Sequence, residues 1–415
     1  MGLLLGALKV IVLLGTLITI HEFGHFIVAK ACGMRVLKFS IGFGPKLIKK
    51  QGKETEYSLR LLPLGGFVQL EGEDEDSDDP RAFNRKPAWQ RILVLLAGVT
   101  INILFALIIY LSINMNTNAY FTSKIASVSS SDVAIQAGLE EGQEITKING
   151  IRIYNSYDIS EIISDAKSDH FTFEVKNQNG EKEEILLEIP KKELGYIGVS
   201  FSDKKVYSVL ENTAGERAGL QANDEILAMN GESKETIDEY LVVIQSNPKQ
   251  AIEMLIERNG EEMTLIVTPE AVRKRIFNVD FTIARDLEFG DNLYYAWKET
   301  MYYLRANVRG MAELFTGNTE NVEVQGIVGI SKQISNTERA VEFFYMMSAI
   351  SLSLGIMNLL PIPGLDGGKI VFTLIEMIRR KPMSRELEGT LTLAGFGLLI
   401  LLMIVVTVGD VASLF

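Results

Sequence analysis

Long apolar runs alternate with charged stretches along this chain. Four of the runs, at about residues 3–31, 89–113, 343–360 and 391–408, each provide the roughly 20 residues that a helix needs to span a bilayer. Residues 114–342, between the second and third runs, mix polar and apolar positions. The pattern therefore predicts four transmembrane helices with a large water-soluble insertion.

The inserted region contains an internal repeat. AGLEEGQEITKING at 137–150 matches AGLQANDEILAMNG at 218–231, with an offset of 81 residues. Each copy continues into a short helical run, an alternating strand and a charged turn. These parts fall at 156–166, 171–175 and 177–181 in the first copy, and at 234–245, 251–256 and 258–261 in the second. Two duplicated small α/β domains fit this pattern.

Composition agrees with a chain that is partly in membrane and partly in water. Of the 415 residues, 47% are hydrophobic and 23% are charged, and the mean hydropathy is +0.16. The net charge of −12 argues against a nucleic-acid partner. A single cysteine, Cys32, excludes an internal disulfide and a cysteine-rich zinc site.

A motif with metal chemistry, His21-Glu22-Phe23-Gly24-His25, lies inside the first apolar run. The two histidines are one helical turn apart and can bind one metal ion, and Glu22 can act as a general base. Ionisable residues at bilayer depth are costly and indicate function. A pair of merely hydrogen-bonded histidines is the alternative, but it buries three polar groups with no other purpose. The motif predicts a zinc hydrolase within the membrane.

A third zinc ligand is needed, because a catalytic zinc ion usually takes three protein ligands and water. The remaining histidine, His170, lies far along the chain in a polar region, so we expect a carboxylate. Asp366 lies in NLLPIPGLDGG at 358–368, where Pro361 and Pro363 break the helix. A helix broken at membrane depth must be buried in protein or line a water-filled cavity. A solvated carboxylate at a helix end is the alternative for Asp366.

Together the two motifs resemble the site-2 protease family of intramembrane zinc metalloproteases. GFGPKL at 42–47, PLGGFVQLEGE at 63–73 and FNRKPAWQRILVLLAG at 83–98 are similar to its bacterial regulator-of-sigma-factor branch. In that branch PDZ domains lie between the second and third transmembrane helices, and the repeat resembles PDZ domains in the circularly permuted bacterial arrangement. AGVTIN at 97–102 departs from the family pattern, which commonly has a proline after the glycine.

The resemblance implies hydrolysis of peptide bonds within single-span membrane proteins, such as anti-sigma factors or remnant signal peptides. Zn²⁺ would be bound by His21, His25 and Asp366, with Glu22 as the base. Asn358 would hydrogen-bond the substrate backbone or the oxyanion, although an amide that packs helices together is the alternative. The PDZ domains would bind peptide C-termini by strand addition, or act only as a spacer or steric filter that gates entry.

Residues 56–70, EYSLRLLPLGGFVQL, contain two apolar or alternating runs around a proline and two glycines. They predict a β-hairpin or a looped strand pair. Strands beside a protease site can pair with an extended substrate, and an ordinary structural hairpin explains the pattern equally well. The substrate contacts that we expect are Gly65, Gly66, Phe67, Val68, Pro361 and Pro363.

Loop charges predict the orientation in the membrane. Lysine and arginine gather between the third and fourth apolar runs and, as Arg85, Lys86 and Arg91, beside the second. The positive-inside rule places both short loops in the cytoplasm, and both termini and residues 114–342 outside. The zinc motif then lies near the cytoplasmic face of a bacterial inner membrane, and the PDZ-like domains are extracytoplasmic.

The predicted fold is a polytopic α-helical membrane protein with four transmembrane helices, a membrane-associated β-hairpin on the cytoplasmic side and two inserted α/β PDZ-like domains. Its parts are 1–119 with two helices and the hairpin, 120–192 and 193–270 as PDZ-like domains, 271–342 as an amphipathic juxtamembrane region, and 343–415 with the last two helices. Residues 291–314 predict an amphipathic helix, on the membrane surface or packed beneath the domains.

A catalytically inactive membrane scaffold that presents PDZ domains is the alternative function. The intact Glu22 argues against it, because a purely structural zinc site has no need of a base.

Overall fold

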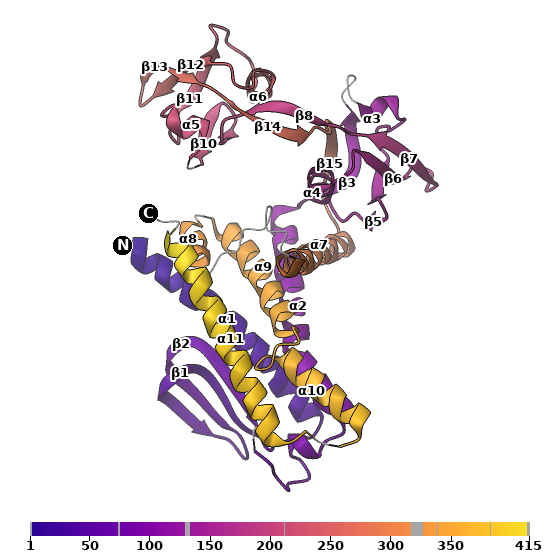
Figure 1. Ribbon diagram of the computed structural model, residues 1–415, viewed down its shortest axis with the longest axis vertical. Helices are drawn as coiled ribbons and strands as arrows, with labels where there is room; N and C mark the ends of the chain where they lie inside the picture. The colour runs from indigo at the N-terminus through magenta and orange to yellow at the C-terminus, as the bar shows by residue number, and fades with distance from the viewer. Residues whose placement is uncertain are drawn as a thin grey trace. The chain divides into compact units, whose positions relative to one another are not determined.

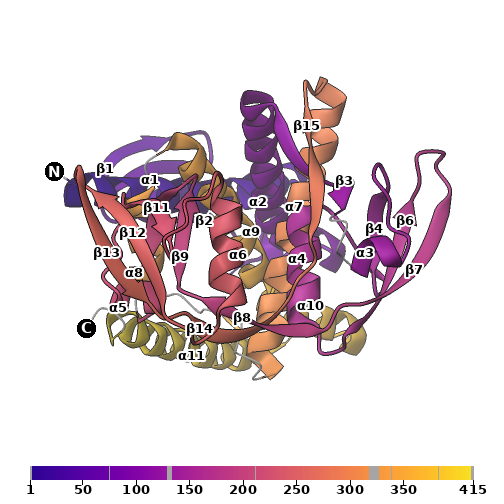
Figure 2. The ribbon, with the colours of Figure 1, turned by 90° about the horizontal axis from the view of Figure 1, so that it is seen from above.

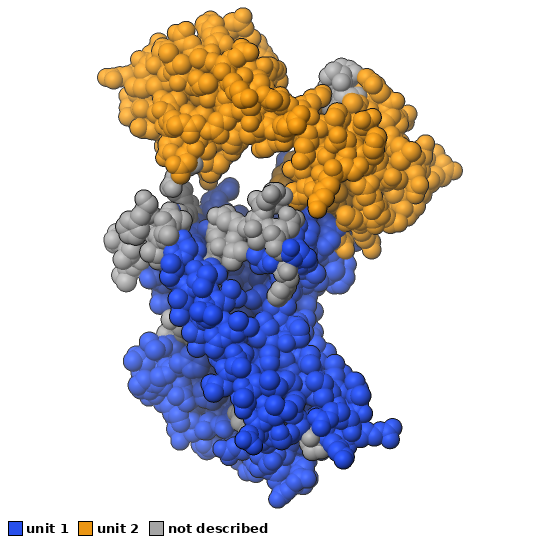
Figure 3. All heavy atoms as spheres, viewed as in Figure 1, with its two compact units in different colours: residues 1–120, 284–415 blue, residues 121–283 orange. Residues whose placement is uncertain are grey.

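The protein divides into two compact units, which Figure 3 shows in separate colours. The computed structural model describes residues 2–73, 75–128, 133–210, 212–316, 327–337, 339–381 and 383–412. Unit 1 comprises residues 1–120 and 284–415, and unit 2 comprises residues 121–283. Unit 1 is mainly helical and unit 2 is rich in strands (Figure 1).

The helices of unit 1 include four that are long and apolar enough to cross a membrane, at the positions that the sequence predicts. The described helices of this unit are α1 (Gly2–Ala31), α2 (Ala88–Thr117), α7 (Phe289–Thr316), α8 (Ile327–Asn336), α9 (Ala340–Asn358), α10 (Asp366–Arg379) and α11 (Arg385–Ala412). The four candidate spans are Gly6–Ala31, Ala88–Thr117, Ala340–Asn358 and Arg385–Asp410. Helix α10 lies between the third and fourth apolar runs, where the sequence predicted only a charged loop.

Helices α1, α2, α7, α8 and α9 share one apolar core. Its buried members include Leu13, Leu17, Ala106, Tyr110, Ala296, Ile334, Met347 and Leu352. The amphipathic helix expected at 291–314 is present as α7 and packs on α2 and α9 through its aromatic face. The Tyr303 ring stacks on that of Tyr110 at 5.5 Å between centroids. The neighbouring helices of unit 1 thus cover part of the apolar face of α7, whereas Leu293, Tyr294 and Trp297 remain exposed.

A small bent sheet lies beside α1 (Figure 1). It is formed by the antiparallel strands β1 (Val36–Gln51) and β2 (Glu56–Leu70). Because both strands bend, Phe39 of β1 pairs with Tyr57 and also with Val68 of β2. Four segments therefore lie side by side in the order 46–51, 56–60, 38–41 and 66–70. Segment 66–70 pairs on one side only among the described residues.

This sheet corrects the strand pairing suggested by the sequence. The two halves of β2 do not pair with each other, because 38–41 of β1 lies between them. Gly65, at a φ of 142° and against the Phe43 ring, bends β2 instead of closing a hairpin there. The sequence reveals the alternation within 56–70 but not its partner, because Gly42, Gly44 and Pro45 interrupt the pattern of β1.

Unit 2 contains two lobes that correspond to the two copies of the repeat. The first lobe has the sheet order β15-β3-β4-β6-β7, and the second has β13-β12-β11-β10-β9. The elements of the first lobe are β3 (Ala119–Val128), α3 (Val133–Gln136), β4 (Glu144–Ile148), β5 (Ile151–Arg152), α4 (Ser156–Asp165), β6 (His170–Lys176), β7 (Lys182–Glu188) and β15 (Val279–Arg285). Those of the second are β9 (Val199–Ser202), β10 (Lys205–Val209), α5 (Ala214–Arg217), β11 (Glu225–Met229), α6 (Ile237–Ser246), β12 (Ile252–Arg258) and β13 (Glu261–Val267). The helical run, strand and charged turn predicted in each copy are confirmed.

Each lobe has its own apolar core, the first around Phe171 and Phe173 and the second around Tyr240 and Met254. Strands β8 (Lys191–Tyr196) and β14 (Glu270–Arg275) pair along the connection between the lobes (Figure 2). The buried Arg275 guanidinium then reaches into the first lobe, where it contacts the Ala166 carbonyl at 2.8 Å and Asp169 at 2.6 Å.

The chain returns to the first lobe after it has built the second, because β15 follows β14 and lies beside β3. At the base of this pair, the hydroxyl oxygens of Thr122 and Thr282 are 2.7 Å apart. Strand β14 and most of β15, up to residue 283, therefore belong to unit 2. The domain boundaries at 192/193, 270/271 and 342/343 stay predictions.

Candidate metal centre

Helix α1 presents two histidines on one face. His21 and His25 are four residues apart, so their side chains project from adjacent turns. Both are buried, with 6% and 9% of their surface exposed. Their Nε2 atoms are 3.2 Å apart. Regular helix geometry alone brings these two nitrogens together.

Asp366, the first residue of α10, completes a three-residue cluster. Its Oδ2 lies 3.1 Å from Nε2 of His21 and 3.2 Å from Nε2 of His25. A tetrahedral zinc site with bonds of about 2.0–2.1 Å separates its ligand atoms by roughly 3.3 Å. The donor set, two imidazoles and a carboxylate, and its near-equilateral spacing therefore fit a zinc ion.

Helix α2 lies close against this cluster through glycine. A Cβ at Gly98 would be 2.6 Å from Nε2 of His25 and 2.7 Å from Nε2 of His21. On the other side of the contact, a Cβ at Gly24 would be 2.5 Å from the Ala97 carbonyl oxygen. The two helices can approach this closely only because both positions lack a side chain.

Helix α2 also contacts the nitrogens of the two rings that face away from the cluster. Nδ1 of His25 lies 2.8 Å from the Val94 carbonyl oxygen, which can accept its proton. Nδ1 of His21 lies 3.3 Å from the Asn102 amide nitrogen. A proton held at Nδ1 leaves the Nε2 lone pair free for a metal ion, so these contacts bear directly on the metal-binding form of each ring.

A break between α9 and α10 positions Asp366. Helix α9 ends at Asn358, and α10 begins at Asp366, after a loop at 359–365. Gly367 and Gly368 lie against that loop. A Cβ at Gly367 would be 2.2 Å from the Leu359 carbonyl oxygen, and a Cβ at Gly368 would be 2.3 Å from that of Ile362. The glycines therefore let the loop fold back onto the start of α10.

The two prolines of this loop and Asn358 differ in their surroundings. Pro361 is exposed and Pro363 is half-buried. The Pro363 carbonyl oxygen would be 1.8 Å from a Cβ at Gly395, so α11 packs directly on the loop. The Asn358 amide nitrogen lies 3.5 Å from Nε2 of His21, at the edge of the three-residue cluster.

Segment 66–70 of β2 lies beside Glu22. The Val68 main-chain N–H donates a hydrogen bond of 3.0 Å to Oε2 of Glu22. A Cβ at Gly66 would be 3.5 Å from Cγ of Glu22. Because N–H groups alternate in direction along a strand, Val68 faces away from β1 and toward the helix. The structure thus brings Gly66 and Val68 next to the predicted base.

The other two residues of the predicted substrate strand lie differently. Gly65 packs on the Phe43 ring, and the Phe67 ring lies 5.2 Å from the Arg60 guanidinium.

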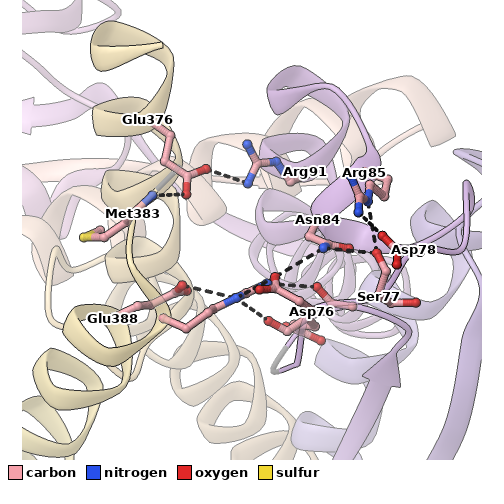
Figure 4. Close-up of polar contacts among 12 residues, drawn as sticks. Asp76, Ser77, Asp78, Asn84, Arg85, Arg91, Glu376, Met383 and Glu388 are labelled. Carbon is pink, nitrogen blue, oxygen red and sulfur yellow. Dashed lines mark hydrogen bonds and ion pairs between the residues drawn. The ribbon is translucent and has the colours of Figure 1, made fainter. Parts of the chain in front are cut away.

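Ion pairs hold α10 at both ends. Near its start, Lys369 pairs with Glu73, which follows β2, at 2.6 Å. Near its end, Glu376 pairs with Arg91 of α2 at 2.8 Å and accepts the Met383 N–H at 2.9 Å (Figure 4). These contacts connect the helix that begins with Asp366 to both α2 and the loop after the sheet.

A cavity of about 1030 Å³ adjoins these ion pairs, between residues 73–91 and helices α10 and α11. Neither the three-residue cluster nor Glu22 is among its lining residues. The cavity and the candidate metal centre are therefore separate features of unit 1.

Two residues beside the cluster were not singled out from the sequence. Gly98 and Asn102 both belong to the second apolar run, where AGVTIN was noted only for its missing proline. An asparagine in the middle of an apolar run is itself a signal, because polar groups in membrane helices need partners. The sequence therefore marks Asn102 as a residue that needs a partner, but it does not identify His21 as that partner.

Comparison with known proteins identifies the family. The model of peptidase family M50 matches residues 9–402. The chain belongs to this family. The predicted kinship with site-2 proteases and the predicted enzyme class, a zinc metalloendopeptidase, are thereby confirmed.

Curated relatives align over nearly the whole M50 chain. Zinc metalloprotease RasP of Geobacillus kaustophilus is 30% identical, with 98% of this chain and 97% of the relative covered. Regulator of sigma-E protease RseP of Escherichia coli is 29% identical, with 95% of each chain covered. The relatives therefore share both the helical unit and the inserted unit with this chain.

Solved structures match a smaller part of the chain. The PDZ domain of HtrA3, bound to a phage-derived ligand, is 17% identical and covers 20% of this chain and 92% of its own, with a TM-score of 0.18. The serine endoprotease from Yersinia pestis is 22% identical over 24% of this chain and 47% of its own, with a TM-score of 0.19.

Proposed function

We propose that this M50 peptidase cleaves peptide bonds inside the membrane-spanning segments of single-span proteins, with zinc held by His21, His25 and Asp366. The observation that carries the proposal is the convergence of three ligand atoms, 3.1–3.2 Å apart, two of which belong to a helix of membrane-spanning composition. Glu22, the carboxylate that the chemistry needs, adjoins His21 in the same helix. The names of the RasP and RseP relatives support a zinc-dependent protease.

Glu22 has the position of a general base. A zinc ion held by His21, His25 and Asp366 would supply Lewis-acid chemistry, which polarises a scissile carbonyl and lowers the pKa of water to about 7. Glu22 then accepts the proton of the attacking water and passes it to the leaving amine. The Val68 N–H holds one carboxylate oxygen of Glu22 at 3.0 Å, which fixes its direction. Asn358, 3.5 Å from His21, is placed to donate to the oxyanion or to the substrate backbone.

The substrate must be extended before it can be cut, because the peptide bonds of a helix are tied up in internal hydrogen bonds. Segment 66–70 of β2 has an unpaired edge among the described residues, and this edge adjoins Glu22. A substrate strand added to this edge would lie beside the base. Gly65, Gly66, Phe67 and Val68 would then contact the substrate, and Pro361 and Pro363, in the loop before Asp366, are the other contacts that we propose.

The natural substrates in this proposal are anti-sigma factors or remnant signal peptides. The enzyme spans a bacterial inner membrane, with the metal centre near the cytoplasmic face and the PDZ-like lobes outside. The lobes admit substrates that have lost their large outer domains and exclude the others, either as a steric filter or by binding new C-termini. Sequence charge supports this orientation, through the positive-inside rule.

A single-span reporter tests the proposed reaction. Glu22→Gln should retain zinc but lose about 10²–10⁴-fold in cleavage rate within the span, because only the base is removed. His25→Ala should lose both zinc and cleavage. His170→Ala is the matched control, since this third histidine is exposed on β6 and should leave cleavage unchanged. Equal processing by the wild type and Glu22→Gln would refute the mechanism and favour the inactive scaffold.

The gate requires a separate deletion, for which the structure defines the ends. Thr122 and Thr282 lie side by side, so residues 123–281 can be replaced by a short Gly-Ser linker without stretching the remaining chain. This variant should cleave both trimmed and untrimmed substrates. If it still refuses the untrimmed substrate while cutting the trimmed one, the lobes are not the filter.

A further inference from the structure

Asn102 is a buried polar residue in the apolar helix α2 and adjoins the metal centre. None of its surface is exposed. Its amide nitrogen lies 3.3 Å from Nδ1 of His21, and its amide oxygen Oδ1 is buried without a hydrogen-bond partner among the described residues. Ser351 of α9 donates a 2.9 Å hydrogen bond to the main-chain oxygen of Asn102. An amide in this setting calls for a chemical explanation, because unpaired polar atoms are costly in apolar surroundings.

The chemistry of His21 supplies that explanation. A neutral imidazole that binds a metal ion through Nε2 carries its proton on Nδ1. That proton needs an acceptor, and an amide oxygen can accept it whereas an amide nitrogen cannot. Turning the Asn102 amide over places its orphaned Oδ1 at the 3.3 Å position beside Nδ1 of His21. The turn replaces a donor that faces a donor with a hydrogen bond, and it moves the amide nitrogen to the position that Oδ1 held.

The same face of α2 already provides a hydrogen-bond acceptor for Nδ1 of the second histidine, His25. Nδ1 of His25 has the Val94 carbonyl oxygen as its acceptor, at 2.8 Å. Val94, Gly98 and Asn102 follow one another at intervals of four residues, so they line one face of α2. Along this face, Val94 accepts from His25, Gly98 leaves room for both rings, and Asn102 lies beside His21.

We propose that Asn102 is a positioning residue, whose amide oxygen accepts the Nδ1 proton of His21 and thereby holds Nε2 toward the metal. The inference rests on the proposed zinc site and adds a residue to it that touches neither metal nor substrate. Partners of this kind orient metal-binding histidines, and their loss costs about 10–100-fold in metal affinity. A carboxylate at the same place would also accept the proton, whereas an apolar side chain would not.

Zinc affinity of the full-length protein in detergent, measured by competition with a chelator, tests the proposal without relying on cleavage. Asn102→Leu, of similar size, should bind zinc about 10–100-fold more weakly. Asn102→Asp should restore affinity close to that of the wild type. Asn114→Leu is the matched control, because Asn114 is another buried asparagine of α2, 2% exposed, and lies about three helical turns beyond Asn102. Its zinc affinity should not change.

The outcomes separate this inference from the proposed function. Wild-type affinity in Asn102→Leu, with zinc lost in His21→Ala, would overturn the role of Asn102 and leave the metal centre intact. Undiminished zinc binding in His21→Ala would overturn the metal centre itself. Equal losses in Asn102→Leu and Asn102→Asp, or in Asn102→Leu and Asn114→Leu, would reduce Asn102 to a packing residue. Thermal melting of each variant shows whether the fold is retained.

Discussion

The two halves of the candidate metal centre are built by opposite means. His21 and His25 lie on an unbroken helix, where a spacing of four residues is enough to bring two ring nitrogens to 3.2 Å. Asp366 follows a break between two helices, and its position depends on a loop whose carbonyl oxygens press on Gly367 and Gly368. The first half needs only local helix geometry, whereas the second depends on contacts between several segments. Changes around the second half should therefore damage folding and chemistry together.

Removal of a zinc ligand should produce the largest loss of cleavage. The loss should be equal whether the ligand comes from the helical half or from the broken half. We expect Asp366→Asn to lose zinc and to fall below detection in cleavage, as His25→Ala does, because a catalytic zinc ion needs three protein ligands. The double variant should be no worse than either single one, since residues that act as a unit are not additive. Reporter cleavage and zinc content measure this. Asp79→Asn, in an ion pair of the same unit, is the control. Substantial cleavage by Asp366→Asn would remove Asp366 from the site.

A methyl group at Gly367 should disrupt the broken half. Its Cβ would lie 2.2 Å and 2.3 Å from two main-chain oxygens, which cannot move without unfolding the loop. Gly367→Ala should lower the free energy of unfolding by about 1–3 kcal/mol and abolish zinc binding as well. Gly389→Ala, on α11 with open space around it, is the control. Melting curves and zinc content of both variants test this prediction. A stable, zinc-loaded Gly367→Ala would show that the loop can shift to accept a methyl group.

A methyl group at Gly98 should damage the helical half without unfolding it. The clash is with the ends of the two histidine rings, which can turn away but then no longer converge. Gly98→Ala should melt like the wild type and lose about 10²-fold in cleavage, a loss typical of misplaced reacting groups. Gly355→Ala, whose added Cβ would make ordinary contacts at 3.5 Å, should remain active. If Gly98→Ala lost both stability and activity, the proposed difference between the helical half and the broken half would be wrong.

The smallest effect should come from the ion pair that ties α10 to the loop after β2. Lys369 and Glu73 are 2.6 Å apart and partly exposed. A double-mutant cycle with Lys369→Met and Glu73→Gln should give a coupling of about 0.2–1 kcal/mol in unfolding, as exposed pairs do. Added salt should weaken this coupling, because mobile ions screen partly exposed charges. A coupling of several kcal/mol would instead make this pair a main support of the zinc-ligand helix.

Much of the site was predictable because its residues carry their chemistry in the sequence. Once HEFGH is helical, its spacing places the two histidines on one face. Because the chain has only three histidines, the third ligand had to be sought among carboxylates. Asp366 stood out because prolines and glycines surround it. The strand partner of β2, helix α10 and the return of β15 to the first lobe were not predictable, because each depends on contacts between distant segments.

The sequence by itself determined the positions of the candidate membrane spans, the repeat in the insertion and the candidate ligand residues. Periodicity and composition are local properties, and burial in a membrane or a core selects for them directly. The tertiary structure alone decided that segment 66–70 lies against Glu22, and that Val94, Gly98 and Asn102 face the histidine rings. Such contacts join residues up to 81 positions apart, and a side chain or main-chain atom reveals its partner only after the helices have packed.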